Sequence, residues 1–372
     1  MATVNITING KYIQARAGST VLEAAKEAGI DIPVLCHHPA LPNEGACRVC
    51  LVEIEKQRTL QPACTFPITE GMVAHTHSPK VIEARKFVLE LLLSDHPLDC
   101  MTCEMAGNCT LQNLAYEYGI KESRYPGEQH AYPIDDPNPF FERDYNKCIV
   151  CRRCVRACNY INGVEAIGMV WRGFKAKVGT AFDGMLEDSP CEFCGMCVAV
   201  CPTGALVPKQ RKGKGREWEF EKVTSVCSYC GMGCQLDLNV KDDRIIQATS
   251  HWEAPANHGW TCVKGRFGWD FVHHQDRLSK PLVRREVLEA WRGKPETETP
   301  ALEGKASAFV PVDWDTALTL VATKFKEVKQ THGGDAWAML CSAKCTNEEN
   351  YLMQKMARQI MGTHNVDHCA RL

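Results

Sequence analysis

The chain has 372 residues, 45% hydrophobic and 24% charged, which is ordinary for a globular protein with room for two or three domains. Its net charge of −2 gives no electrostatic reason to expect nucleic acid or a membrane surface as a partner. No apolar run reaches the roughly 18 to 20 residues that span a bilayer, and "MATVNITING" lacks the features of a secretory signal. We therefore expect a cytoplasmic protein with no membrane span.

Cysteine is the unusual part of the composition, with 22 residues, most of them in tight C-x2-C groups. In a small secreted chain this number would suggest a disulfide framework. Without an export signal, closely spaced cysteines favour shared metal centres instead. Four such groups follow one another along the chain.

The first predicted domain, residues 1–79, begins with a small sheet and a helix. "VNITINGKYIQA" predicts a hairpin that turns at Asn9-Gly10, and Thr20 with Glu23 forms a capping box for a helix that stops at Gly29. The first cysteine group follows: Cys36, Cys47, Cys50 and Cys64.

This unit resembles the β-grasp fold of [2Fe–2S] ferredoxins. Its spacing departs from the plant-type pattern. It is similar instead to the version at the start of the large electron-transfer subunit of respiratory complex I, several hydrogenases and formate dehydrogenases. The four cysteines are the expected [2Fe–2S] ligands, and zinc is the alternative.

The second predicted domain, residues 80–120, pairs the amphipathic stretch "VIEARKFVLELLL" with a group that has only three thiols. Its candidate ligands are His96, Cys100, Cys103 and Cys109. A [4Fe–4S] cluster needs four ligands, and a neutral imidazole can be one of them. The group resembles the helical module with one histidine and three cysteine ligands in the same families. Other histidines lack such company and are interpreted as ordinary residues: His37, His38, His75 and His77.

The third predicted domain, residues 138–210, carries two successive C-x2-C-x2-C-x3-C runs. This is the pattern of bacterial two-cluster ferredoxins, in which the fourth cysteine of each run binds the other cluster. One [4Fe–4S] cluster is therefore expected on Cys148, Cys151, Cys154 and Cys201. The other is expected on Cys158, Cys191, Cys194 and Cys197.

The fourth group, in the predicted domain 220–277, follows the basic segment "KQRKGKGRE", which we interpret as a solvated linker. The group resembles the [4Fe–4S] domain of molybdopterin oxidoreductases, and its expected ligands are Cys227, Cys230, Cys234 and Cys262. In that family a lysine two places after the last ligand bridges cluster and pterin, and the resemblance gives this role to Lys264.

Residues 278–372 are predicted to begin a pterin-binding α/β domain. Asp313 or Asp315 is the expected N-cap of a helix whose apolar face includes Leu318, Val321, Ala322 and Phe325. After Gly333-Gly334, "AWAMLCS" predicts a buried strand, "SAKCTNEENY" a loop, and "ENYLMQKMARQIMG" a helix that ends at Gly362. Polar loops after strands are where α/β folds place ligands.

The loop "SAKCTNEEN" resembles the one that contacts the pterin in the formate dehydrogenase branch. That resemblance implies cofactor contacts from Lys344, Thr346, Asn347 and Glu348. Cys341, Cys345 and Cys369 lack metal-ligand spacing and are expected to be buried small apolar residues.

The last four residues, Cys369-Ala370-Arg371-Leu372, resemble the run that precedes the metal-ligating cysteine or selenocysteine of molybdenum and tungsten formate dehydrogenases. A catalytic Sec or Cys is therefore expected immediately after Leu372. The sequence would then be truncated at an unread UGA codon and inactive by itself. A deliberately shortened chain and a short electron-transfer subunit are the alternatives.

Together these features predict a multidomain α+β protein, the N-terminal part of an anaerobic formate dehydrogenase or CO2 reductase. It would hold one [2Fe–2S] and four [4Fe–4S] clusters and the start of a site for a bis-molybdopterin guanine dinucleotide with tungsten or molybdenum. No G-x-G-x-x-G follows a strand, so electrons are expected to pass to flavin-bearing NAD(P)H dehydrogenase-type or hydrogenase-type subunits. The alternatives are a complex I-like electron-transfer subunit without pterin chemistry and an iron-only hydrogenase.

Overall fold

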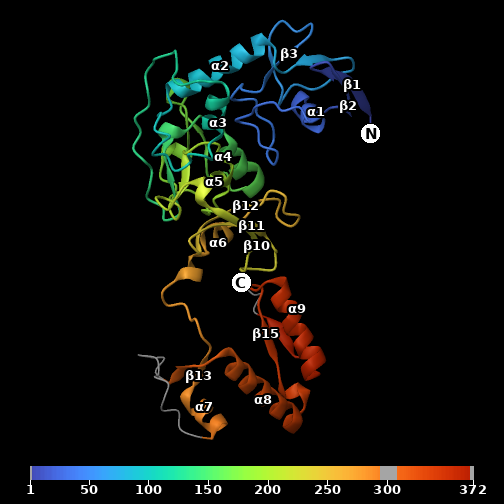
Figure 1. Ribbon diagram of the computed structural model, residues 1–372, viewed down its shortest axis with the longest axis vertical. Coiled ribbons are helices and arrows are strands. Elements are labelled where there is room, and N and C mark those ends of the chain that lie inside the picture. The colour runs from blue at the N-terminus through green and yellow to red at the C-terminus, as the bar shows by residue number, and fades with distance from the viewer. Residues whose placement is uncertain (1, 294–307, 369–372) are drawn as a thin grey trace. The chain divides into compact units, whose positions relative to one another are not determined.

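The protein is described from a computed structural model that covers residues 2–293 and 308–368. The chain divides into two compact units. Unit 1 comprises residues 1–225 and 236–267, and unit 2 comprises residues 226–235 and 268–372. Each unit combines helices and short strands, as the predicted multidomain α+β class requires (Figure 1).

Unit 1 begins with a five-stranded sheet of order β2-β1-β5-β3-β4. Its strands are β1 (Thr3–Ile8), β2 (Lys11–Arg16), β3 (Leu51–Ile54), β4 (Gln61–Pro62) and β5 (Val73–His75). The hairpin prediction is confirmed: β1 and β2 pair antiparallel around Asn9 and Gly10, which both have positive φ. The central strand β5 pairs parallel with β1, and helix α1 (Val21–Glu27) lies between them in the chain.

Helix α1 starts with the predicted capping box, in which the Thr20 hydroxyl accepts from the Glu23 amide and the Glu23 carboxylate accepts from the Thr20 amide. Its buried face packs with Ile6, Ile8 and Val52 of the sheet in one apolar core. Cys50 and Cys64 belong to the same core. The first cysteine group is thus built into the packing of this domain.

Two helices follow the sheet: α2 (Pro79–Ser94), the predicted amphipathic helix, and α3 (Thr110–Glu117). Leu89 and Leu93 of α2 pack with Leu111 and Leu114 of α3 and with Cys109. The loop between the helices carries the second cysteine group. No helix in the parts of the chain that the structure describes is both long and apolar enough to cross a bilayer.

The third region has short elements around its cysteines: β6 (Phe141–Arg143), α4 (Arg153–Arg156), a π-helical turn (Ala157–Asn162), β7 (Gly168–Val170), β8 (Lys177–Gly179), α5 (Met196–Val200) and β9 (Leu206–Pro208). β6 pairs with β9, which brings the two ends of the region together. Unit 1 closes with β10 (Glu221–Val226), β11 (Gln235–Lys241), β12 (Arg244–Ser250) and α6 (Val263–Phe267).

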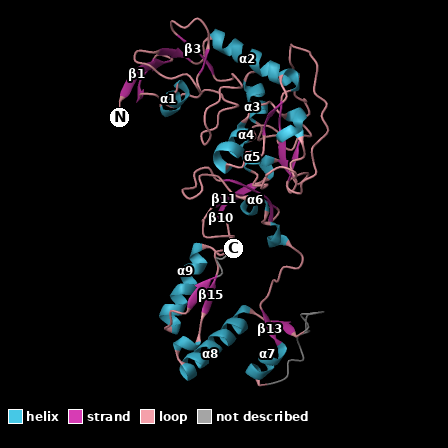
Figure 2. Cartoon of the chain, turned by 180° about the vertical axis from the view of Figure 1, so that it is seen from behind, coloured by secondary structure: helices cyan, strands magenta, loops and turns pink. Residues whose placement is uncertain are grey.

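Unit 2 contains two small α/β pieces, seen from behind in Figure 2. The first consists of β13 (Leu282–Arg284), α7 (Arg285–Arg292), β14 (Phe309–Pro311) and α8 (Trp314–His332). The second consists of β15 (Met339–Cys341), α9 (Asn347–Lys355), a π-helical turn (Met356–Met361) and β16 (Val366–His368). β15 and β16 pair parallel. Asp313 rather than Asp315 caps α8, through its carboxylate and the Thr316 amide at 2.7 Å.

Two packing predictions for unit 2 are wrong. Leu318 and Val321 are exposed, and the buried residue of α8 is Leu320. The helix touches two separate cores, Ala317 in one and Phe325 in the other, so one continuous face does not describe it. The strand "AWAMLCS" is likewise not buried throughout, because it joins a two-stranded sheet in which Leu340 is 79% exposed.

Candidate metal centres

Contacts link the four thiols of the first cysteine group in one chain. The Cys36 amide donates to the Cys47 sulfur at 3.3 Å. Thiol contacts then join Cys36 to both Cys47 and Cys64, and Cys50 to Cys64. Cys36, Cys50 and Cys64 are almost completely buried. The structure therefore brings together the set that spacing suggested.

The contacts with Cys47 and Cys64 lower the pKa of Cys36 to about 2. The hydrogen bonds with Cys36 and Cys50, together with burial, raise the pKa of Cys64. One thiolate is thus stabilised by its neighbours, whereas four thiolates would repel one another. A bound iron–sulfur cluster would supply the positive charge that lets all four act as ligands, so these residues fit such a group.

The second group places a buried imidazole beside thiols. His96 is 8% exposed, and no hydrogen-bond partner for its Nδ1 lies among the residues that the structure describes. Burial lowers the pKa of His96, which favours the neutral form that ligates metals. His96, Cys100 and Cys109 line one cavity, and the Cys103 sulfur faces Gly204 of the third region. An orphaned buried nitrogen beside thiols fits a ligand role.

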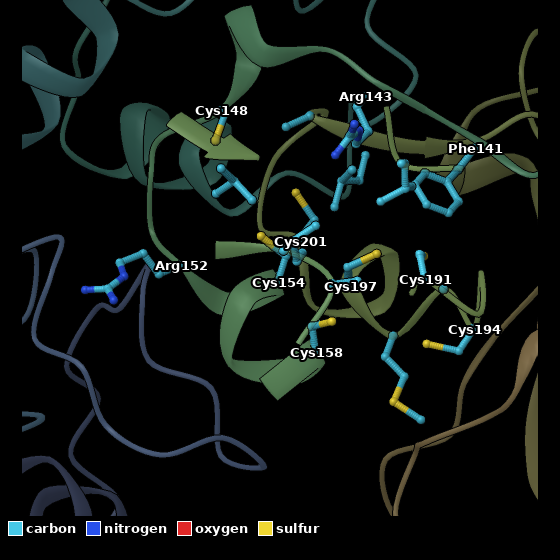
Figure 3. A pocket seen from close by; sticks show the side chains of 18 of the residues that line it. Phe141, Arg143, Cys148, Arg152, Cys154, Cys158, Cys191, Cys194, Cys197 and Cys201 are labelled. Carbon is cyan, nitrogen blue, oxygen red and sulfur yellow. The ribbon is translucent and has the colours of Figure 1, made fainter. Parts of the chain in front are cut away.

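The third group gathers all eight of its cysteines around one pocket. They come from the ends of α4 and α5 and the turns before those helices: Cys148, Cys151, Cys154, Cys158, Cys191, Cys194, Cys197 and Cys201. Figure 3 labels seven of these side chains around the pocket, all except Cys151. Burial raises the pKa of Cys148 to about 11 and of Cys151 to about 12. Thiols this buried need positive charge to ionise, and iron would provide it.

The two runs of the third group share one backbone design. Val150 and Phe193 occupy equivalent places and both have positive φ, as do Arg152 and Gly195. These turns aim the Val150 amide at the sulfur of Cys148 and the Phe193 amide at that of Cys191. Positive φ at a bulky residue is strained, and such strain concentrates at functional sites. The repeated turns support an internal duplication of one cluster-binding motif.

The fourth group is divided between the units. Cys227, Cys230 and Cys234 belong to unit 2, where the Cys227 amide donates to the Cys234 carbonyl at 2.8 Å. Cys262 belongs to unit 1, as does Lys264, which is exposed on α6. That these four cysteines share a cluster, and that Lys264 bridges it to a pterin, both stay predictions.

The loop before α9 uses two of its four predicted cofactor residues for structure. Thr346 caps α9 through a capping box with Glu349. The Asn347 side-chain amide donates to the Gly231 carbonyl at 2.8 Å, which ties α9 to the loop between Cys230 and Cys234. Lys344 and Glu348 are exposed. The pterin contacts of all four remain predictions.

The remaining cysteines differ from expectation. Cys341 and Cys345 are only partly buried, because they lie at the end of the small sheet and in the loop that follows it. The Cys341 sulfur lies 4.0 Å from that of Met353. Cys369 and the run that ends at Leu372 lie outside the described residues.

The prediction that the basic segment 209–217 is a solvated linker is wrong. Arg211 is 1% exposed and donates to the Glu104 carbonyl. Arg216 donates to the carbonyls of Cys103 and Met101 at 2.6 and 2.5 Å. The segment therefore holds the loop of the second group. Arg153 and Arg156, which sequence reasoning also missed, make similar bonds to the loop of the first group.

Family comparisons assign every part of this series. A "2Fe-2S iron-sulfur cluster binding domain" matches residues 1–79, an "NADH-ubiquinone oxidoreductase-G iron-sulfur binding region" residues 85–124, and an "NADH-quinone oxidoreductase subunit 3, ferredoxin-like domain" residues 138–207. A "Molybdopterin oxidoreductase Fe4S4 domain" matches residues 220–274, and "Molybdopterin oxidoreductase" matches residues 277–372. The chain is therefore similar, region by region, to [2Fe–2S] and [4Fe–4S] cluster-binding regions followed by molybdopterin oxidoreductase regions.

Among similar proteins, the "NADPH-Fe(3+) oxidoreductase subunit alpha" of Geobacter sulfurreducens is 38% identical over 99% of this chain and 40% of its own length. An NADH-quinone oxidoreductase G protein of Rhizobium meliloti is 36% identical with the same coverage. A "Putative formate dehydrogenase" of Staphylococcus aureus is 31% identical over 98% of this chain and 39% of its own length. The chain thus spans about 40% of the length of these curated relatives.

A solved structure of an NAD+-reducing [NiFe]-hydrogenase contains a chain that is 33% identical. The match has a TM-score of 0.54 and covers 57% of this chain and 91% of that one. The likeness therefore covers little more than half of the present chain.

Proposed function

We propose that the chain supplies the electron-transfer clusters and the first part of the pterin-binding region of a formate dehydrogenase that also reduces CO2. The observation that carries the electron-transfer part is the single pocket lined by eight cysteines. The formate part rests on the resemblance of the loop 342–350 and of residues 367–372, and on the 31% identical relative that is named as a formate dehydrogenase.

The proposed cluster ligands are the five sets read from the sequence. The first set would hold a [2Fe–2S] centre: Cys36, Cys47, Cys50 and Cys64. Four sets would hold [4Fe–4S] centres: His96 with Cys100, Cys103 and Cys109; Cys148, Cys151, Cys154 and Cys201; Cys158, Cys191, Cys194 and Cys197; and Cys227, Cys230, Cys234 and Cys262. Contacts and cavities in unit 1 support the first four sets.

The chemistry supplied by a bound bis-pterin tungsten or molybdenum centre is the two-electron oxidation of formate to CO2 and a proton. Lys264, two residues after Cys262, would provide the link between that centre and the fourth cluster. Lys344 and Glu348 are exposed and do not cap the helix. They would therefore be more available to contact the cofactor than Thr346 and Asn347.

Partner subunits are proposed by analogy with the relatives. The Geobacter and Rhizobium proteins are named for NADPH and NADH, and the hydrogenase is named as NAD+-reducing. A flavin-bearing NAD(P)H dehydrogenase-type or hydrogenase-type subunit would therefore exchange electrons with unit 1.

The second candidate function is an NAD(P)H-linked electron-transfer subunit without formate chemistry. It is favoured by the higher identity, 38% and 36%, to proteins that are named for NADPH and NADH. It needs the clusters but not the pterin contacts, so the two candidates differ in the roles of Lys264 and of unit 2.

The proposed cluster ligands can be tested by measuring the iron content of the 372-residue chain, produced under anaerobic conditions. Fully loaded chain should contain about 18 iron atoms, and markedly less would remove at least one proposed centre. Cys201→Ala should lower the iron content by about four atoms per chain and abolish one [4Fe–4S] signal. Cys341→Ala, which changes a cysteine outside the proposed sets, should leave iron content unchanged.

The formate part is tested on the full-length protein that contains this chain, produced with tungsten and, separately, with molybdenum. Formate-dependent reduction of a viologen dye is the expected result. If the protein reduces the dye with NADPH or NADH through a partner subunit but never with formate, the second candidate function is correct.

A further inference from the structure

Two buried arginines of α4 tie the loop of the first cysteine group to the third group. Arg153 and Arg156 lie between Cys151 and Cys158 in the chain and are 9% and 2% exposed. Arg153 donates to the His37 carbonyl at 2.6 Å, and Arg156 donates to the carbonyls of Cys36 and Pro42. Side chains from one candidate cluster site thus hold the backbone of the other.

The same loop is seated by apolar and ionic contacts. Leu41, 6% exposed, packs in a small core with Ala157 and Val200 of the third region. Glu44 pairs with Arg156 at 3.8 Å and with Arg152. The hydrogen bonds of the two arginines therefore add to an interface in which the loop already packs against α4 and α5.

Arg153 differs from Arg156 in having no carboxylate within ion-pair distance among the residues that the structure describes. Its hydrogen bonds go to the carbonyls of His37 and, at 3.5 Å, Val200. A buried guanidinium without an anion is costly. Electrostatically, the Arg156 guanidinium repels it, and the groups that attract it are the sulfurs of Cys151 and Cys201, from one proposed set, and of Cys36, from another. Thiolate-ligated iron–sulfur centres carry negative charge and would therefore offset the positive charge of the buried Arg153 guanidinium.

We propose that Arg153 and Arg156 are positioning residues that fix the [2Fe–2S] loop beside the Cys148–Cys201 cluster, and that Arg153 raises the reduction potentials of both centres. The inference rests on the ligand sets of the proposed function. Reduction adds a negative charge to a centre, and a nearby buried cation stabilises the reduced form more than the oxidised one. The two adjacent centres would thereby become easier to reduce together.

The test is a redox titration of the reconstituted 372-residue chain, in which the electron paramagnetic resonance signal of the reduced [2Fe–2S] centre is followed. Arg153→Met should lower the equilibrium constant for its reduction about tenfold, a shift of about 59 mV for one electron. Arg153→Lys, which retains the charge, should shift it by less than half as much. The control Arg172→Met removes an exposed arginine of the same region and should cause no shift.

A potential that is unchanged in Arg153→Met would overturn the proposal. Equal shifts in Arg153→Met and Arg153→Lys would also overturn it, because packing rather than charge would then be the cause. If Arg153→Met does not fold, a shift of about 59 mV in the folded Arg153→Lys variant would likewise overturn the proposal, because the charge is retained in that variant. A missing [2Fe–2S] signal in the unmodified chain would instead refute the ligand assignment itself.

Discussion

At the scale of single residues, the third cysteine group depends on one close approach of backbone and side chain. Gly195 has φ +71, and a Cβ placed there would come within 2.7 Å of Phe267 and also collide with Arg266. The matching position in the first run is Arg152, with φ 63, so the backbone conformation alone does not demand glycine. The contact with α6 demands it.

Gly195→Ala should therefore destabilise the chain by about 2 kcal/mol or more, through backbone strain plus overpacking. Gly163→Ala is the matched control, since Gly163 has φ +73 but nothing within 4 Å of its Cβ position. The control should show the strain alone, about 1 kcal/mol. Urea unfolding of the two variants measures the difference, and equal losses would show that the contact with α6 is unimportant.

The candidate ligands that the structure gathers could be selected from the sequence, but the arginines that hold their loops in place could not. Metal-ligand spacing is a local property of the sequence, so it pointed to all eight cysteines of the pocket and to His96. Arg153 and Arg211 bind backbone carbonyls of segments more than a hundred residues away, and a carbonyl leaves no mark in the sequence. Such arginines look like surface charges until the fold is known.

At the scale of secondary-structure elements, helix α9 begins with a capping box that also lies in the proposed pterin loop. Thr346→Ala should remove the cap and cost about 1 kcal/mol, whereas Thr346→Ser should keep it. Hydrogen exchange of the α9 amides reports this loss directly, because fraying of the first turn speeds their exchange. Unchanged protection in Thr346→Ala would show that the Asn347–Gly231 tie alone holds the end of the helix.

The segment 209–217 is the second element whose role can be tested. Arg211 contacts the Glu104 carbonyl, pairs with Glu217 at 3.5 Å and lies over the Phe220 ring. Arg211→Met should cost about 3 kcal/mol, because it breaks a buried ion pair and releases the second cysteine loop. Lys214→Ala, an exposed change in the same segment, should stay within about 0.5 kcal/mol. If both variants unfold at the same urea concentration, the segment is a passive connection after all.

Elements with local signals were predicted correctly, and those that depend on distant partners were not. The β1–β2 hairpin and the cap of α1 follow from neighbouring residues, which also narrowed the cap of α8 to Asp313 or Asp315. The parallel pairing of β1 with β5 joins Thr7 to Val73, and the buried side of α8 depends on two separate cores. Neither the strand pairing nor the buried side of α8 can be predicted from the periodicity of apolar residues.

At the scale of the whole molecule, cysteines are distributed unevenly among the cores. In unit 1, candidate ligands belong to the packing itself, including Cys50 and Cys64 in the sheet core and Cys109 between α2 and α3. The described cores of unit 2, around Leu288 and around Trp337, contain no cysteine. Metal binding and folding are therefore expected to be coupled in the cores of unit 1, whereas in unit 2 only the loop with Cys227, Cys230 and Cys234 would depend on a cluster.

Removal of iron with a chelator under reducing, anaerobic conditions should test this coupling. Without a cluster, the thiols of unit 1 must either stay protonated in buried positions or repel one another as thiolates, so its cores lose stability. We expect faster proteolysis and faster amide exchange in α2, α4 and α5 after chelation, with rates in α7 and α8 unchanged. Equal acceleration in both units would show that unit 2 depends on the clusters for its fold. No change in unit 1 would show that its cores stand without metal, which contradicts a structural role for the bound clusters.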